Sequence, residues 1–214
     1  MGRSGCISSV SSPGPGDVRI GAGRLQLGRQ DTTVNLEDRD RLVLFEQVLR
    51  SLVPEVKGVA KRGVDLALEA VREEMRSVTG TPPSPQAEAQ LRSRRDQVHA
   101  RIDASSSTRD WQGEAFEREM QAMANELVPI LAADVARRGM ELAMAGDMAG
   151  AAVLQRQAQN LPQTMRARIE RSLEPLQPDV ARLCPRVREL AELNQGMSLR
   201  LDDGQRLELL RLKD

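Results

Sequence analysis

Aromatic residues are almost missing from this chain. Its 214 residues contain one tryptophan, two phenylalanines and no tyrosine. They are Trp111, Phe45 and Phe116. Proteins that bind single strands stack the bases on exposed aromatic rings, and proteins that bind duplexes need a basic surface. Because 31 basic side chains are balanced by 31 acidic ones, the composition predicts no nucleic-acid partner.

Histidine is equally scarce. His99 is the only one, so a His-ligated metal site, or a Ser–His or Cys–His catalytic pair, would have to use it. Its polar helical surroundings predict an exposed surface residue. We expect the acidic pairs Glu73-Glu74 and Asp202-Asp203 to be solvated, because two carboxylates do acid–base work only where their environments separate their pKa values.

Recognisable reaction and membrane motifs are lacking too. The sequence holds no GxxxxGK[ST] phosphate loop, no GxGxxG after a strand and no CxxC pair. We therefore predict that the protein is not an enzyme and uses no cofactor or metal. No stretch approaches the roughly 18 uninterrupted apolar residues of a membrane span, so the chain is predicted not to span a membrane.

The N-terminal residues 1–16 are small, polar and rich in Gly, Pro and Ser, which predicts a flexible arm. They contain no apolar core of a signal peptide. This fits a cytoplasmic protein, or an exported one whose signal has been removed or omitted. Ser4-Gly5-Cys6 matches only the end of a lipoprotein cleavage site, which leaves a lipid-modified Cys6 as a further option.

Alternating polar and apolar residues predict short strands in residues 17–34 and a hairpin in residues 197–212 around Asp203-Gly204. Residues 35–194 between them carry apolar residues at helical spacing. An isolated hairpin is marginally stable in water, so the terminal pieces are expected to pair with each other or to lie on the helices. We predict a mainly α protein: an elongated bundle of about five to six helices, with a small antiparallel β element formed by the N- and C-terminal segments.

A short pattern occurs twice in the helical region. LVPEVKGVAKRGVDLAL begins at Leu52 and LVPILAADVARRGMELAM at Leu127. Pro54 and Pro129 are predicted to stand near helix starts, where a missing N–H is harmless. Gly63 and Gly139 fall on the apolar stripe of each copy, which favours close packing against another helix. In the alternative, the two glycines line a groove for an apolar guest.

A second apolar pattern steps by four and three residues, as in a coiled coil. Its members are Phe116, Met120, Met123, Leu127 and Ile130. Two heptads are few, so a coiled-coil interface is one option and an ordinary core stripe the other.

Two cysteines are present, Cys6 and Cys184. Cys184 lies on an apolar helix face, where a buried free thiol is common. Cys6 has no packing role in a flexible arm. A bridge between them would close a loop of roughly 180 residues, worth about 5 kcal/mol in the chain-entropy model, and would favour an oxidising compartment.

The run from Leu49 to Leu68, LRSLVPEVKGVAKRGVDLAL, resembles the hallmark of the YggN-type family, Gram-negative proteins of unknown function assigned to the periplasm. Leu183-Cys-Pro-Arg-Val-Arg-Glu-Leu190 is similar to the cysteine-containing helix near the end of that family. The resemblance covers Cys6 to about Leu193, and the hairpin beyond it is expected to lie outside the family. It implies a periplasmic address and a Cys6–Cys184 bridge, and it supplies no catalytic residues.

These observations predict a non-enzymatic periplasmic protein that acts through helical surfaces on an unknown protein partner or envelope component. One alternative is a carrier, in which Gly63, Gly139 and the methionine-rich run from Met120 to Met148 enclose a small apolar ligand. The other is a cytoplasmic coiled-coil adaptor with two free thiols. Neither the oligomeric state nor the partner follows from the sequence.

Overall fold

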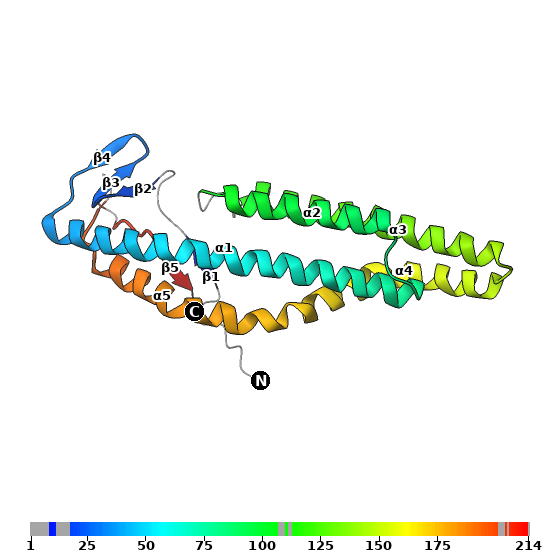
Figure 1. Cartoon of the computed structure of the whole chain (residues 1–214). Helices are drawn as coiled ribbons and strands as arrows, with labels where there is room; N and C mark the ends of the chain where they lie inside the picture. Colours follow the sequence, from blue (N-terminus) through cyan, green and yellow to red (C-terminus); the bar gives the residue numbers. More distant parts are fainter. Residues whose placement is uncertain are drawn as a thin grey trace. The chain divides into compact units, whose positions relative to one another are not determined.

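The computed structural model describes residues 9–11, 18–106, 110, 113–200, 204 and 206–213 (Figure 1). Within them the protein is mainly helical with a small antiparallel β component, as predicted. The chain divides into two compact units, Ala60–Leu176 and the combination of Met1–Val59 with Gln177–Asp214. We call the combination of Met1–Val59 and Gln177–Asp214 the terminal unit. Helix α1 (Leu36–Thr79) begins in the terminal unit and ends in the unit Ala60–Leu176.

The terminal unit contains a three-stranded meander of β2 (Val18–Gly21), β3 (Arg24–Leu27) and β4 (Gln30–Thr32). β2 and β3 match the predicted strands. They join through Ala22 and Gly23, both with positive φ (50° and 71°), which is the two-residue turn that suits the twist of a hairpin. β4 also lies within residues 17–34, for which short strands were predicted. Its three polar residues show no alternation, and they extend the sheet because Gly28, also with positive φ (62°), turns them back onto β3.

The two ends of the chain also pair. β1 (Ser9–Ser11) and β5 (Arg211–Lys213) form an antiparallel ladder, which confirms the predicted β element between the N- and C-terminal segments. Before β5, an antiparallel bridge joins Arg200 and Arg206 beside Gly204, whose φ is 79°. Asp203, predicted to share that turn, lies outside the described residues.

Helix α1 has the predicted start but not the predicted break. The side-chain oxygen of Asn35 accepts a hydrogen bond from the Asp38 N–H at 2.7 Å, which caps the helix. We expected a new helix near Pro54, yet Pro54 lies inside α1. Its side chain is exposed, so the carbonyl four residues earlier is on the solvent side and water can replace the lost hydrogen bond.

The same correction applies to two other prolines. Pro129, expected near a helix start, is exposed inside α3 (Gly113–Met144). Pro162, preceded by Asn160, also has the sequence pattern of a helix start, but α4 (Met148–Ser172) passes through that point without a break. In each case packing on both sides of the proline sustains the helix, because one missing N–H removes only one of its hydrogen bonds.

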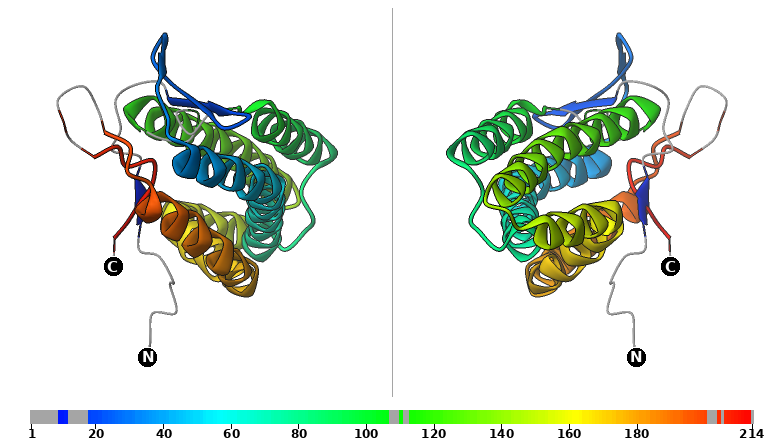
Figure 2. Two further views of the ribbon diagram at one scale, coloured as in Figure 1. Left: turned by 90° about the vertical axis from the view of Figure 1, so that its left-hand side faces the viewer. Right: turned by 90° about the vertical axis from the view of Figure 1, so that its right-hand side faces the viewer.

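The unit Ala60–Leu176 holds the end of α1, α2 (Pro85–Ala104), α3, α4 and the short 3₁₀ helix η2 (Glu174–Leu176). α3 and α4 run side by side as a hairpin, and Figure 2 shows the helices closer to end-on. Apolar side chains from these helices form its core. The buried members are Leu68, Val71, Met75, Ala87, Leu91, Ile130, Leu131, Val135, Leu154, Leu161 and Met165.

The terminal unit has its own core, between the first part of α1, the sheet, α5 (Gln177–Gly196) and the segment after it. Its buried members are Leu25, Leu42, Phe45, Leu52, Leu190, Met197, Leu199 and Leu207. Leu199 and Leu207 come from the predicted hairpin region, where the Leu207 N–H donates to the Leu199 carbonyl at 2.9 Å. The C-terminal segment therefore closes this core.

Candidate functional site

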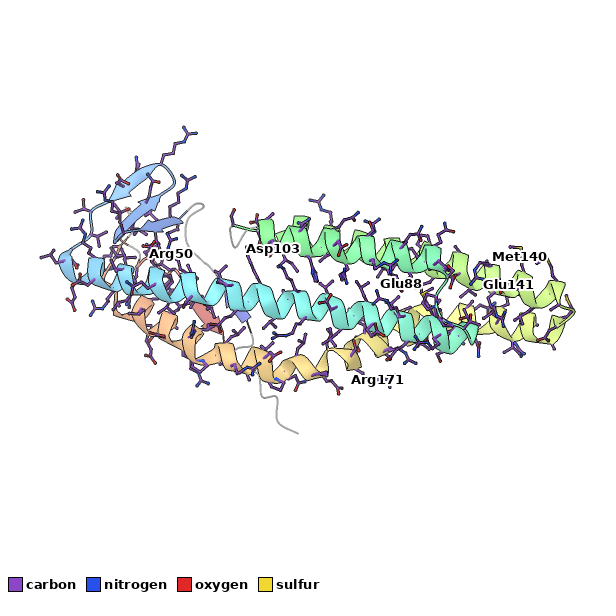
Figure 3. The ribbon with its side chains drawn as sticks, in the orientation of Figure 1. Arg50, Glu88, Asp103, Met140, Glu141 and Arg171 are labelled. Carbon is purple, nitrogen blue, oxygen red and sulfur yellow. The ribbon has the colours of Figure 1, made fainter. Side chains whose placement is uncertain are left out.

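A cleft of 430 Å³ lies between α1 and α2. Charged side chains dominate its lining. Figure 3 draws the described side chains of the two helices as sticks. The lining residues are Asp65, Leu66, Leu68, Glu69, Arg72, Arg95, Asp96 and His99. Asp65, Glu69 and Arg72 are spaced by four and three residues, which places them on one face of α1.

His99 does not lie on a solvated helix face, as we had expected. Its side chain is only 24% exposed, and its Nε2 lies 3.2 Å from Oδ1 of Asp65 on α1. The Nε2 atom is buried and makes no hydrogen bond of good geometry with a described residue. His99 therefore faces α1 rather than solvent. The sequence carried one usable signal for this pairing, the polar stripe of α1 that begins at Asp65.

The arginines that line the cleft are already paired. Arg72 Nε donates to Glu88 at 2.9 Å, and its Nη1 donates to Glu69 at 3.2 Å. The hydrogen bond to Glu88 is the main reason why the pKa of Arg72 is raised above its ordinary value. Arg95 pairs with Asp96 at 2.8 Å. These ion pairs leave the cleft without a preformed site for an anionic group.

The lining of the cleft limits its chemistry. It contains no Ser, Thr, Cys or Lys side chain, so His99 has no nucleophile there to activate. Across the described part of the chain, His, Cys, Asp and Glu form no group of three or more that could hold a metal ion. The cleft is lined mainly by charged groups, and nothing in it identifies a reaction.

Of the predicted solvated acids, one is buried. The side chain of Glu74 is 6% exposed and pairs with Arg168 of α4, whereas that of Glu73 is 53% exposed and lies 3.5 Å from the same arginine. Successive residues of a helix point about 100° apart, so one member of the pair faces the core and the other faces water. Asp202-Asp203, the second pair, lies outside the described residues.

Each glycine of the repeated pattern lies close to a leucine side chain. A Cβ built on Gly63 would lie 3.3 Å from Cδ1 of Leu176, and one on Gly139 would lie 3.8 Å from Cδ2 of Leu154. Gly63 thus allows a close approach to the end of the α4–η2 segment, while Gly139 has room for a methyl group. The structure does not bring the two glycines together, and Pro54 and Pro129 are exposed.

Cys184 is 7% exposed on α5, in the terminal unit. Its Sγ lies 3.7 Å from the carbonyl oxygen of Val180 one turn earlier. Cys6, its predicted partner, lies outside the described residues.

The coiled-coil pattern is described only at its end. Ile130 is buried, and Leu127 packs on the same core of the unit Ala60–Leu176. The side chains of Phe116, Met120 and Met123 lie outside the described residues.

Exposed apolar side chains occur on helices of both units. On α1, Leu49, Val53 and Val56 are 38%, 41% and 43% exposed. Around the α3–α4 turn, Met140, Met144 and Met148 are 64%, 82% and 67% exposed. These three methionines, part of the run suggested to enclose a ligand, therefore lie at the surface. No helix in the described portion is long and apolar enough to cross a membrane.

Comparison with known proteins places the chain in a family. No curated protein and no solved structure matches it. A family model described as "Protein of unknown function (DUF2884)" matches residues 8–210. The match includes Cys184 and extends past Leu193 into the C-terminal segment. The chain belongs to the DUF2884 family of proteins of unknown function.

Proposed function

We propose that this protein is a non-enzymatic periplasmic protein that acts by contact with a protein partner or envelope component through its helical surfaces. The observation that carries this proposal is the apolar face of α1 formed by Leu49, Val53 and Val56, which is 38–43% exposed. Three neighbouring apolar side chains on one helix face form a patch of the kind that marks an interaction site.

Another side of this stretch of α1 contacts α5. Arg186 of α5 donates to the Ser51 hydroxyl at 2.9 Å and pairs with Glu55 at 2.9 Å. Leu52 is buried in the core of the terminal unit. α5 therefore covers the side of α1 that carries Ser51 and Glu55, and the apolar face of α1 points elsewhere. It is available to a partner that brings apolar side chains of its own.

The family resemblance supports a periplasmic address. The run from Leu49 to Leu68 resembles the YggN-type family, which implies export. A bridge between Cys6 and Cys184 would also require an oxidising compartment. We include this bridge in the proposal. It would tie the N-terminal arm to α5.

In-cell photo-crosslinking tests the interaction. A photoreactive amino acid at Val53 should give a discrete crosslinked species in living cells, and the same probe at Glu37, whose side chain is 75% exposed, should not. Val53→Glu should weaken the contact, which an adjacent probe at Val56 would report. Equal crosslinking at positions 53 and 37, or no crosslink at position 53, would contradict the proposal.

The same experiment separates the alternatives. A cytoplasmic adaptor would crosslink to cytoplasmic proteins. A carrier would show no protein adduct at position 53. Both outcomes would contradict the proposal.

A further inference from the structure

The turn between α3 and α4 is a defined structural element. The Asp147 N–H donates to the Leu142 carbonyl at 2.9 Å and the Gly146 N–H donates to the Ala143 carbonyl at 3.0 Å. With Gly146 at a φ of 83°, this is a Schellman motif at the end of α3. Asp147 then caps α4, since its Oδ1 accepts from the Gly150 N–H at 2.8 Å. Hydrogen bonds therefore fix both helix ends.

Three methionines stand at this turn. Met140 and Met144 are one helical turn apart on the same face of α3, and Met144 is its last residue. Met148 is the first residue of α4. Their side chains are 64%, 82% and 67% exposed, and Figure 3 labels Met140 close to the turn. We refer to Met140, Met144 and Met148 as the methionine tip.

An ordinary core role does not account for the methionine tip. Met75, Met165 and Met197 are between 1% and 8% exposed and fill the two cores. The three tip methionines are far more exposed. They share the turn with small residues, including Ala143, Ala145, Gly146, Ala149 and Gly150, which fits their high exposure.

The acidic groups near the methionine tip already make other interactions. Asp147 caps α4, and Glu141 pairs with Arg137 and Arg138. Hard cations such as Mg²⁺ and Ca²⁺ need several oxygen ligands, which the tip does not offer. Thioethers are soft, neutral ligands and favour Cu(I) among biological metals. The neighbouring arginines are ion-paired, which reduces their repulsion of a cation.

We infer that the methionine tip binds a soft monovalent cation, Cu(I), through the thioether sulfurs of Met140, Met144 and Met148. Each side chain has three rotatable bonds beyond its backbone, so its sulfur can adjust around an ion, while the hydrogen-bonded turn keeps the three backbones in place. The inference is independent of the contact function proposed for α1, because the two rest on different residues.

Titration of the unreduced full chain with Ag(I), an air-stable ion of the same class, tests this site. With methyl-labelled methionine, the nine methionines report separately by NMR. The methyl signals of Met140, Met144 and Met148 should shift and saturate at about one ion per chain. Anaerobic competition with a chromogenic Cu(I) chelator then gives the affinity for Cu(I) itself.

Substitution by leucine keeps the apolar surface and removes only the sulfur. The triple variant M140L/M144L/M148L should keep its melting temperature and lose Cu(I) binding. Met144→Leu alone should weaken binding at least roughly tenfold, since even loss of an outer-shell group costs about 10- to 100-fold. Met165→Leu, the same change in the core, should leave the affinity unchanged.

Three results would overturn the inference. The first is no binding in competition with the chelator, which would leave the tip as an apolar contact surface. The second is unchanged affinity in the triple variant, which would assign the ion to the cysteines or to other methionines. The third is methyl shifts confined to methionines outside the tip.

Discussion

Asp38 and Ser198 join the first turn of α1 to the segment after α5, across 160 residues of sequence. The backbone N–H of Ser198 donates to Oδ1 of Asp38 at 3.0 Å, and its hydroxyl donates to Oδ2 at 2.6 Å. The Nδ2 group of Asn35 donates to the same carboxylate at 2.8 Å. Asp38 is 1% exposed, so this cluster is an internal tie of the terminal unit.

This tie predicts sensitivity to acid. Burial alone would raise the pKa of Asp38, but the hydrogen bonds from Ser198 and Asn35, together with the charge of Arg41, lower it overall. A carboxyl group whose pKa is depressed by folding stabilises the protein above its unfolded pKa of about 3.9, and this contribution is lost as the pH falls through the folded pKa. Asp38→Asn should therefore cost about 2 kcal/mol near neutral pH and less near pH 2, below the unfolded pKa.

Urea unfolding at both pH values measures this difference. Asp40→Asn, an exposed neighbour on α1, is the control and should leave stability nearly unchanged. An Asp38→Asn deficit of equal size at both pH values would contradict the role assigned to the carboxylate.

Gly63 and Gly58 offer a matched test of close helix packing within α1. A Cβ on Gly58 would meet nothing within 4 Å, so Gly58→Ala should stabilise the protein by about 0.5–1 kcal/mol. Gly63→Ala should gain less, because the new methyl group would lie 3.3 Å from Leu176. Gly63→Leu should cost about 1–3 kcal/mol. Thermal unfolding checks all three, and a wild-type melting temperature for Gly63→Leu would refute the packing role.

Gly139 should respond differently from Gly63. Its nearest neighbour, Leu154, is 3.8 Å from the built Cβ, an ordinary van der Waals contact. Gly139→Ala is therefore expected to raise the free energy of unfolding by about 0.5–1 kcal/mol. A clear loss of stability in urea unfolding would show that α3 and α4 lie closer together than the structure places them.

The β2–β3 turn predicts a strong requirement for glycine at position 23. Gly23 has a φ of 71°, and a Cβ there would lie 2.8 Å from Cγ of Arg39 and 3.2 Å from the Arg39 carbonyl oxygen. Gly23→Ala combines strain with a clash and should cost more than Gly28→Ala, which has a φ of 62° and open space. We expect about 1 kcal/mol for Gly28→Ala and at least about 2 for Gly23→Ala. Equal losses in chemical denaturation would mean that the sheet does not rest on α1.

Substitution of Glu73 and Glu74, neighbours on α1, should have different effects on stability. Glu74→Gln removes a buried partner of Arg168 and should cost about 1–3 kcal/mol. Glu73→Gln changes an exposed group and should stay within about 0.5 kcal/mol of the wild type. Comparison of their urea midpoints tests whether Glu74 ties α4 to α1. Similar midpoints would mean that burial of Glu74 has no energetic consequence.

Periodicity predicted the helical class, the start of the helical region at residue 35 and strands β2 and β3, because each has a local signal. The sequence pattern wrongly indicated helix starts at Pro54 and Pro129. A local rule about the missing proline N–H does not account for the packing that sustains a long helix. The His99–Asp65 approach and the Asp38–Ser198 tie were not predicted. Each joins residues far apart in sequence, and only the folded chain brings them together.

A thiol count on unreduced, denatured protein from its own cells tests the central claim, that this is an exported protein, most directly. The account predicts no free thiols and an intramolecular Cys6–Cys184 peptide by mass spectrometry. Two free thiols, with no lipid on Cys6, would contradict it and would favour the cytoplasmic adaptor.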